Sequence, residues 1–218
     1  DPMLQGTSLR LVDTQHFGVL EVRTYERAQS DRLVRDLVAD FDEHAMVARH
    51  RRSGEAEGTC RLEPEGFLRI MGLFVGPATP RKRFLCSPFD PSGSFVAPTV
   101  VTDLHFVPRR CLFLPPWGST VLRVELPKGP VGHKVVGYVG LHAFNERELV
   151  GAPVHARISI ANQPVAETLH MDGEGWKRFE GSTAAMAGRE ETVVLETWLD
   201  GPSEHGGRPV CLAAELRD

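Results

Sequence analysis

The sequence contains no run of the roughly 18–20 apolar residues that a membrane-spanning helix requires, so we expect no membrane span. It also lacks G-x-S-x-G, H-E-x-x-H, a Walker loop and a dinucleotide-binding glycine fingerprint. These absences remove the direct evidence for an enzyme without excluding one, and they favour a non-catalytic role. The first residues, Asp1–Gly6, have neither the basic nor the apolar segment of a signal peptide. A fragment of a longer protein would lack these segments too.

Lysine is scarce: the 25 basic residues comprise 21 Arg and only 4 Lys, in a chain with a net charge of −4. Short basic clusters occur at residues 49–52, 81–83 and 109–110. In an acidic chain, without interleaved aromatic residues, such clusters are typical of a solvated surface. We therefore expect no nucleic acid among the partners.

None of the four cysteines forms a C-x-x-C pair, which removes the local signal for redox and zinc-ribbon motifs. An even number of scattered cysteines in a β-rich chain is typical of disulfides in an oxidising compartment, and it predicts an extracytoplasmic (periplasmic or secreted) protein. Four buried free thiols in a cytosolic protein are the alternative. Of three possible connectivities, we expect Cys60–Cys86, tying a proline-rich loop back, and Cys111–Cys211, joining strands.

Between residues 30 and 52 the apolar residues recur at steps of three and four, which predicts one N-terminal amphipathic helix. Ser30 is its expected N-cap, the arginines of residues 49–52 suit its C-terminus, and Gly54 follows it. We expect this helix and the two short strands before it to form a region, residues 1–60, that packs on a sandwich. A docking or dimerisation face is the alternative use of the apolar stripe: Leu33, Val34, Leu37, Val38, Phe41, Ala45 and Ala48.

From about residue 61 to 218 the pattern is that of short strands separated by turn residues, interrupted by a long proline-rich loop at 76–98. Val154–Ile160 alternates most clearly, with Val154, Ala156, Ile158 and Ile160 inward and His155, Arg157 and Ser159 outward. The expected fold is mainly β, an antiparallel β-sandwich of the jelly-roll type. Further strands are expected at residues 9–12, 17–22, 66–74, 100–107, 111–114, 120–126, 134–142, 175–180, 192–199 and 209–217.

Two segments carry a resemblance to a known class. Asp172–Phe179 is a turn that opens onto a strand beginning with an aromatic residue, and Val210–Arg217 is a closing strand. With them, residues 119–217 resemble the galactose-binding-like jelly rolls of carbohydrate-binding modules in secreted proteins. The resemblance implies a sandwich fold and a saccharide ligand. The chain departs from sugar binders in having only three Trp and two Tyr, with no evident aromatic platform.

The strongest concentrations of polar residues lie in two segments, 142–148 and 170–176. If both lie at one end of the sandwich, their planar side chains suit vicinal sugar hydroxyls, with Trp176 as a stacking face. Asp172 and Glu174 could alternatively bind Ca²⁺ through carboxylate oxygens, and we expect no other cofactor. The competing interpretation is an ordinary surface turn with Trp176 in the core. The predicted ligand-binding residues are His142, Asn145, Arg147, His170, Asp172, Glu174 and Trp176.

These patterns predict a non-catalytic extracytoplasmic β-sandwich module that binds a carbohydrate or a protein partner, either a glycan or a protein of the cell envelope. One alternative is a purely structural domain of a cell-envelope protein. The other is a hydrolase that acts on saccharide or ester substrates.

Overall fold

The computed structural model describes residues 9–18, 20–27, 31–63, 82–86, 95–201 and 207–218, and the chain divides into two compact units, Asp1–Arg32 and Leu33–Asp218. The first unit contains an antiparallel hairpin, β1 (Leu9–Phe17) and β2 (Leu20–Arg27). Gly18, with φ of +64°, adopts the left-handed conformation at the turn. The predicted strand at 9–12 lies within β1, whereas the predicted strand at 17–22 spans this turn.

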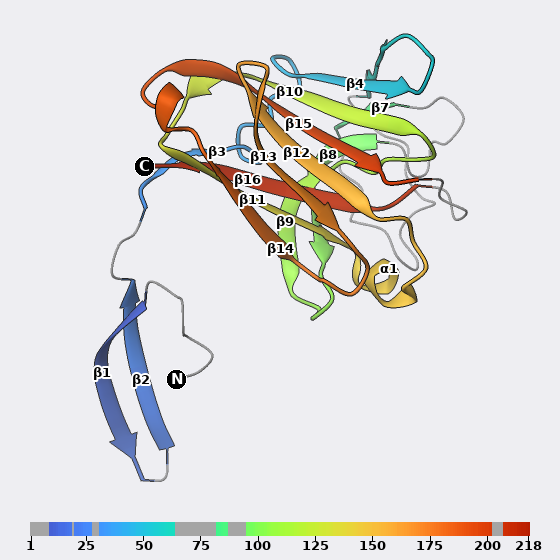
Figure 1. Cartoon of the computed structure of the whole chain (residues 1–218). Helices are drawn as coiled ribbons and strands as arrows, with labels where there is room; N and C mark the ends of the chain where they lie inside the picture. Colours follow the sequence, from blue (N-terminus) through green and yellow to red (C-terminus); the bar gives the residue numbers. More distant parts are fainter. Residues whose placement is uncertain (1–8, 19, 28–30, 64–81, 87–94, 202–206) are drawn as a thin grey trace. The chain divides into compact units, whose positions relative to one another are not determined.

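The second unit is built from two antiparallel sheets (Figure 1). One has six strands in the order β13-β12-β15-β10-β4-β5. Its strands are β4 (Val47–Arg52), β5 (Gly58–Thr59), β10 (Thr120–Pro130), β12 (Val154–Ile160), β13 (Gln163–His170) and β15 (Glu190–Leu199).

The other sheet has eight strands, in the order β14-β11-β16-β9-β8-β7-β6, with β3 also pairing with β16. The last strand in sequence, β16, therefore pairs with β11, β9 and β3. The strands are β3 (Leu33–Asp36), β6 (Arg61–Glu63), β7 (Arg83–Leu85), β8 (Phe95–Thr102), β9 (Pro108–Phe113), β11 (Lys134–Leu141), β14 (Lys177–Ser182) and β16 (Val210–Arg217). The prediction of a mainly β, antiparallel sandwich is confirmed, and its finer assignment as a jelly roll stays a prediction.

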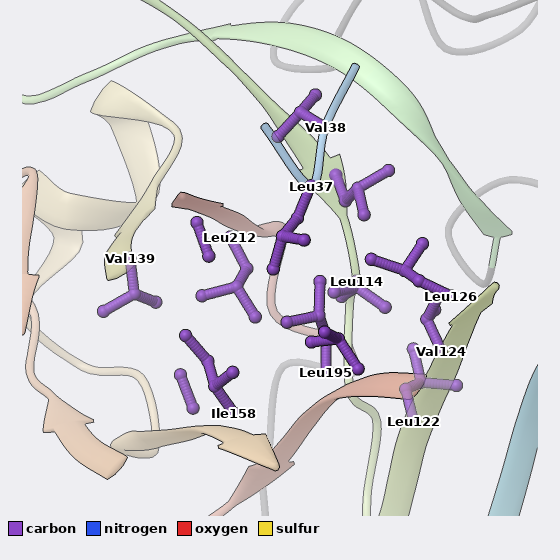
Figure 2. Packing of buried hydrophobic residues seen from close by; sticks show 14 of the residues in the cluster. Leu37, Val38, Leu114, Leu122, Val124, Leu126, Val139, Ile158, Leu195 and Leu212 are labelled. Atoms are coloured by element: carbon purple, nitrogen blue, oxygen red, sulfur yellow. The ribbon is translucent and has the colours of Figure 1, made fainter. Parts of the chain in front are cut away.

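The core lies between the two sheets, and alternate residues of strands such as β10 and β12 fill it (Figure 2). Val154, Ala156, Ile158 and Ile160 of β12 all have an exposed fraction of 0%, which confirms the predicted inward set. At roughly 1.5–3 kcal/mol per fully buried aliphatic side chain, this alternation supplies much of the driving force for folding. Leu122, Val124 and Leu126 of β10, Leu195 of β15 and Leu212 of β16 are packed in the same cluster.

The predicted N-terminal amphipathic helix is wrong. Residues 31–52 form strand β3, a series of turns and strand β4. Asp36 Oδ1 accepts hydrogen bonds from the backbone N–H of Val38 (2.9 Å) and Ala39 (3.0 Å), so its side chain stabilises a turn in place of a helix. The spacing of apolar residues was misleading because Leu37 and Val38 enter the core from the turn, whereas Ala48 enters it from a strand. The α-helix among the described residues is α1 (Ala143–Glu148), within one of the predicted polar loops.

Both predicted disulfides are confirmed: Cys60–Cys86 and Cys111–Cys211. Cys111 lies on β9 and Cys211 on the neighbouring β16, so the second bridge joins adjacent strands of one sheet. Most of the predicted proline-rich loop at 76–98 and the predicted strand at 66–74 lie outside the described residues. Within the described part, no helix has the length and apolar character needed to cross a membrane.

Candidate functional site

The two predicted polar loops meet at one end of the sandwich, and Glu146 joins them. Its side chain is fully buried on α1. One carboxylate oxygen accepts from Leu141 N (3.0 Å) and lies 2.8 Å from His170 Nε2; the other accepts from Gly173 N (2.9 Å) and Gly175 N (3.3 Å). Both glycines have positive φ, which turns their N–H groups toward the carboxylate. The loops therefore share one network, and its centre is a residue that was not among the predicted ligands.

The two carboxylates considered for calcium are already engaged with protein partners. Asp172 pairs with the buried Arg208 and accepts from Gly151 N at 2.9 Å. Glu174 lies 2.8 Å from Lys177 Nζ. Burial acts to raise the pKa of Glu174, but the hydrogen bonds from Lys177 and from the backbone N–H of Met171, with the nearby charges, together outweigh burial and lower it. Among the described residues, no group of three or more His, Cys, Asp or Glu side chains converges on a point that could hold a metal ion. Calcium binding stays a prediction.

The remaining predicted residues are also tied to their surroundings. His142 is the N-cap of α1, and its Nδ1 accepts from Phe144 N at 3.4 Å; burial lowers its pKa. Arg147 lies over the ring of Phe106, 4.3 Å from its centroid. Asn145 and Trp176 are half-buried, and the Trp176 ring is parallel to that of Tyr138 at 6.3 Å between centroids. Protein contacts thus occupy much of the expected stacking face.

This end of the sandwich also exposes a group of large apolar side chains. Of the eleven exposed large hydrophobic residues in the described part of the chain, six belong to its loops: Phe106, Val107, Phe144, Leu149, Val150 and Met171. Phe106 (φ +61°) and Leu149 (φ +56°) adopt the left-handed conformation, which is unusual for bulky side chains. Exposed apolar clusters of this kind are typical of macromolecular contact surfaces. We call these six residues the loop-end apolar cluster.

A second set of polar side chains lies on the outer face of the six-stranded sheet. Strand register places Glu167, Arg157, Glu196, Arg123 and Arg49 in one row across β13, β12, β15, β10 and β4. Arg157 Nε donates to Glu167 at 2.8 Å. The nearest guanidinium nitrogens of Arg157 and Arg123 lie 3.8 and 3.9 Å from Glu196 oxygens. These two distances exceed those of direct hydrogen bonds, so Glu196 is placed between two arginines without being closely bound by either.

An aromatic stack borders this row. The rings of His155 on β12 and Trp198 on β15 are parallel, with centroids 4.7 Å apart and 2° between the ring planes. The guanidinium of Arg157 lies 4.6 Å from the centroid of Trp198. Cross-strand stacking of this kind fixes side chains that would otherwise sample several rotamers, so the face is rigid here.

Two hollows open on the same face. The first, of about 230 Å³, is lined by Arg123, Arg157, Ser159, Pro164 and Glu196, and we call it the arginine hollow. The second, of about 260 Å³, is lined by Glu125, Lys128, Ala161, Glu191 and Thr192, and we call it the glutamate hollow.

Both hollows share Asn162 and Val194, so together they form one trough. Asn162 (φ +63°) follows Ala161 (φ +49°) in the two-residue turn between β12 and β13, a conformation that asparagine tolerates well. The trough is therefore bounded by a tight turn and based on regular strands.

None of the seven predicted ligands lies in this trough. The signal in the sequence that pointed toward the trough was the alternation of inward and outward residues along β12. This alternation was expected to place His155, Arg157 and Ser159 outward, as it does. The same alternation in β15 buries Val193, Leu195 and Thr197, and so places Glu196 and Trp198 on the outer face.

No family model matches the chain, and no curated protein matches it. Solved structures with partial similarity come from Clostridium perfringens ZmpB. One holds CBM51-2 in complex with GlcNAc and INT domains (TM-score 0.34, 9% identity, 56% of this chain and 26% of that chain). Another holds CBM51-2 and INT domains (TM-score 0.36, 7% identity, 96% and 40%), and a third holds the M60 catalytic domain with CBM51-1 and CBM51-2 (TM-score 0.35, 10% identity, 85% and 20%).

These structures contain carbohydrate-binding modules, the class that residues 119–217 resemble. The chain spans at most 40% of the length of these solved chains. TM-scores of 0.34–0.36 are too low to indicate what this chain binds.

Proposed function

We propose that this chain is a non-catalytic, extracytoplasmic module that binds a saccharide in the trough on the outer face of its six-stranded sheet. The observation that carries the proposal is the trough itself, two adjoining hollows lined by planar polar side chains. A site built on strands is held more firmly than one built on loops, because the ladder and the core beneath fix each side chain.

The chemistry of the trough suits hydroxyl groups, which donate and accept hydrogen bonds at once. Arg123 and Arg157 supply donors, Glu196 supplies acceptors, and the Asn162 amide supplies both. Because the Arg–Glu196 distances of 3.8–3.9 Å leave Glu196 short of direct hydrogen bonding to either arginine, a ligand can bond to this carboxylate without breaking a tight ion pair. The neighbouring Trp198–His155 stack adds a rigid edge of partly apolar surface.

The two disulfides support the extracytoplasmic part of the proposal. Disulfides persist in oxidising compartments and are rare in the cytosol, where thiols are kept reduced. Both bridges are buried, and all four cysteines are used. A saccharide on a cell surface or in its surroundings is the ligand that such a compartment offers.

A glycan array, followed by titration calorimetry on any glycan that binds, tests the proposal. Arg123→Ala and Glu196→Gln are expected to weaken binding at least about tenfold while leaving the melting temperature near that of the wild type. Arg51→Ala, on β4 of the same sheet and outside the trough, is the matched control and is expected to bind normally. If no glycan binds at all, the structural-domain alternative becomes the better account.

Variants at the loop end distinguish binding in the trough from binding at the site predicted by sequence. Arg147→Ala and Asp172→Asn are expected to leave glycan binding intact, because their side chains contact Phe106 and Arg208 in place of a ligand. Loss of binding in these two variants, with the trough variants unaffected, would place the saccharide at the loop end.

A second candidate function, binding of a protein partner, is favoured by the loop-end apolar cluster. Phe144 is 50% exposed and Leu149 is 67% exposed, so neither side chain is needed for the core. The Phe144→Ser/Leu149→Ser double variant is expected to keep both the glycan profile and the melting temperature. A clear fall in melting temperature would mean that these side chains serve the fold and would remove the observation that favours a partner.

A further inference from the structure

We infer that the ligand of the trough is a segment of at least two sugar rings lying along β15, and not a single sugar. This inference rests on the proposed function, and it concerns how many sugar rings of a glycan the site binds. Three features of the trough support it: its length, the different chemistry of its two hollows, and the position of Asn162.

The trough is longer than one sugar ring. Its lining runs along β15 from Glu196 in the arginine hollow to Glu191 in the glutamate hollow. The five residue-to-residue steps of antiparallel strand between them, at about 3.4 Å each, correspond to about 17 Å. The two hollows have similar volumes, about 230 and 260 Å³, and are separate except for two shared residues. A single ring would fill one hollow and leave the other to water.

The two hollows have opposite charge character. The arginine hollow contains two guanidinium groups, of Arg123 and Arg157, and one carboxylate, Glu196. The glutamate hollow contains two carboxylates, Glu125 and Glu191, and one ammonium group, Lys128. The first therefore favours a ring that presents acceptor oxygens, and the second favours a ring that presents hydroxyl donors. A ligand that uses both hollows lies in one direction along the strand.

Asn162 lies where the two rings would be joined. It lines both hollows, and its exposed side chain projects from the tight turn between β12 and β13. An amide presents a donor and an acceptor side by side, so it can bond to a group on each ring beside the glycosidic linkage. Val194, the other shared residue, is 2% exposed, so it contributes to the base of both hollows and offers a ligand little surface.

Calorimetric titration with length series tests the inference. The probes are cello-, chito- and manno-oligosaccharides of one to six rings. For at least one series, affinity is expected to rise at least about tenfold between one ring and two or three rings and then to level off. A flat series, in which the monosaccharide binds as tightly as the longer chains, would overturn the inference and leave the proposed function standing. Absence of binding in all three series, together with a blank glycan array, would overturn both.

Two variants assign the rings to the hollows. Lys128→Ala/Thr192→Ala alters the glutamate hollow and is expected to lower the affinity for long chains about tenfold, toward that for the single ring, and to lower single-ring affinity far less. Arg123→Ala alters the arginine hollow and is expected to weaken binding at every length. Equal losses at every length for both variants would mean one undivided site and would contradict the inference. Melting temperatures, with Arg51→Ala as the control, establish that each variant is folded.

Discussion

Replacing Glu146 with alanine should destabilise the protein severely, although the residue lies in a polar segment whose sequence is typical of a surface loop. The carboxylate is fully buried and is the common acceptor for Leu141 N, His170 Nε2, Gly173 N and Gly175 N. Alanine removes the acceptor and leaves these donors facing each other in a space closed to solvent.

The expected loss of folding free energy follows from the donors that are left without an acceptor. Leaving one buried donor without its acceptor typically costs about 1–3 kcal/mol, so the loss of an acceptor shared by four donors should cost about 3–5 kcal/mol in all. For a unit of the size of Leu33–Asp218, each kcal/mol corresponds to about 2–4 °C, so the melting temperature should fall by about 6–20 °C. Glu146→Gln keeps the shape but sets an amide N–H₂ against backbone donors, so it should recover only part of the loss.

Urea unfolding followed by tryptophan fluorescence, together with calorimetric melting, measures both variants. Glu148→Gln, an exposed position on the same helix, is the control and should match the wild type. A Glu146→Ala protein within about 1 kcal/mol of the wild type would refute the reasoning, since donors left without partners cost more than that.

Three further predictions concern the core, the bridges and pH. Ile158→Ala should lose about 2–5 kcal/mol in urea unfolding, because the side chain is fully enclosed between the sheets; a loss below about 1 kcal/mol would contradict that burial. Replacing both cysteines of Cys111–Cys211 should cost more than replacing those of Cys60–Cys86. Loop-closure entropy gives about 4.7 against about 3.5 kcal/mol for separations of 100 and 26 residues, and the reverse order in chemical unfolding would oppose this account. Burial lowers the pKa of His142, so the native state disfavours its protonation, and stability should fall as pH drops below the unfolded value of about 6.5. His142→Asn, which keeps an N-cap acceptor, should show a smaller fall between pH 7.5 and 5.5, and an unchanged pH profile would exclude His142 as its source.

The strands could be predicted where one face is buried and the other is solvated. Val154–Ile160 and the run at 192–199 show a period of two because one sheet face meets the core. Strand β13 was missed because Gln163, Pro164 and Glu167 give it no apolar face in sequence. The error at residues 30–52 has the opposite cause. Apolar side chains from a turn and from a strand both reach the core, and their combined spacing imitates a helix.

The candidate site was harder to predict for a geometric reason. The sequence identified two polar segments and left open whether they meet. Glu146 does join them, but the polar groups there mostly bond to one another. The trough combines Arg123, Arg157 and Glu196 from three strands. Arg157 was predicted as an outward residue of its own strand, yet only the strand register, which no local pattern contains, makes it a neighbour of Glu196 and brings Glu196 beside Arg123.

The place of β16 in its sheet has a consequence for how the chain folds. Residues 210–217 pair with β11, with β9 and with β3, and β3 begins at Leu33. Pairing between segments so far apart in sequence makes for slow folding, because the intervening chain must be ordered before the contacts form. During synthesis on the ribosome, β3, β9 and β11 are all complete long before their common partner emerges. Until then they present unpaired strand edges, so the nascent chain is most prone to aggregation in this interval.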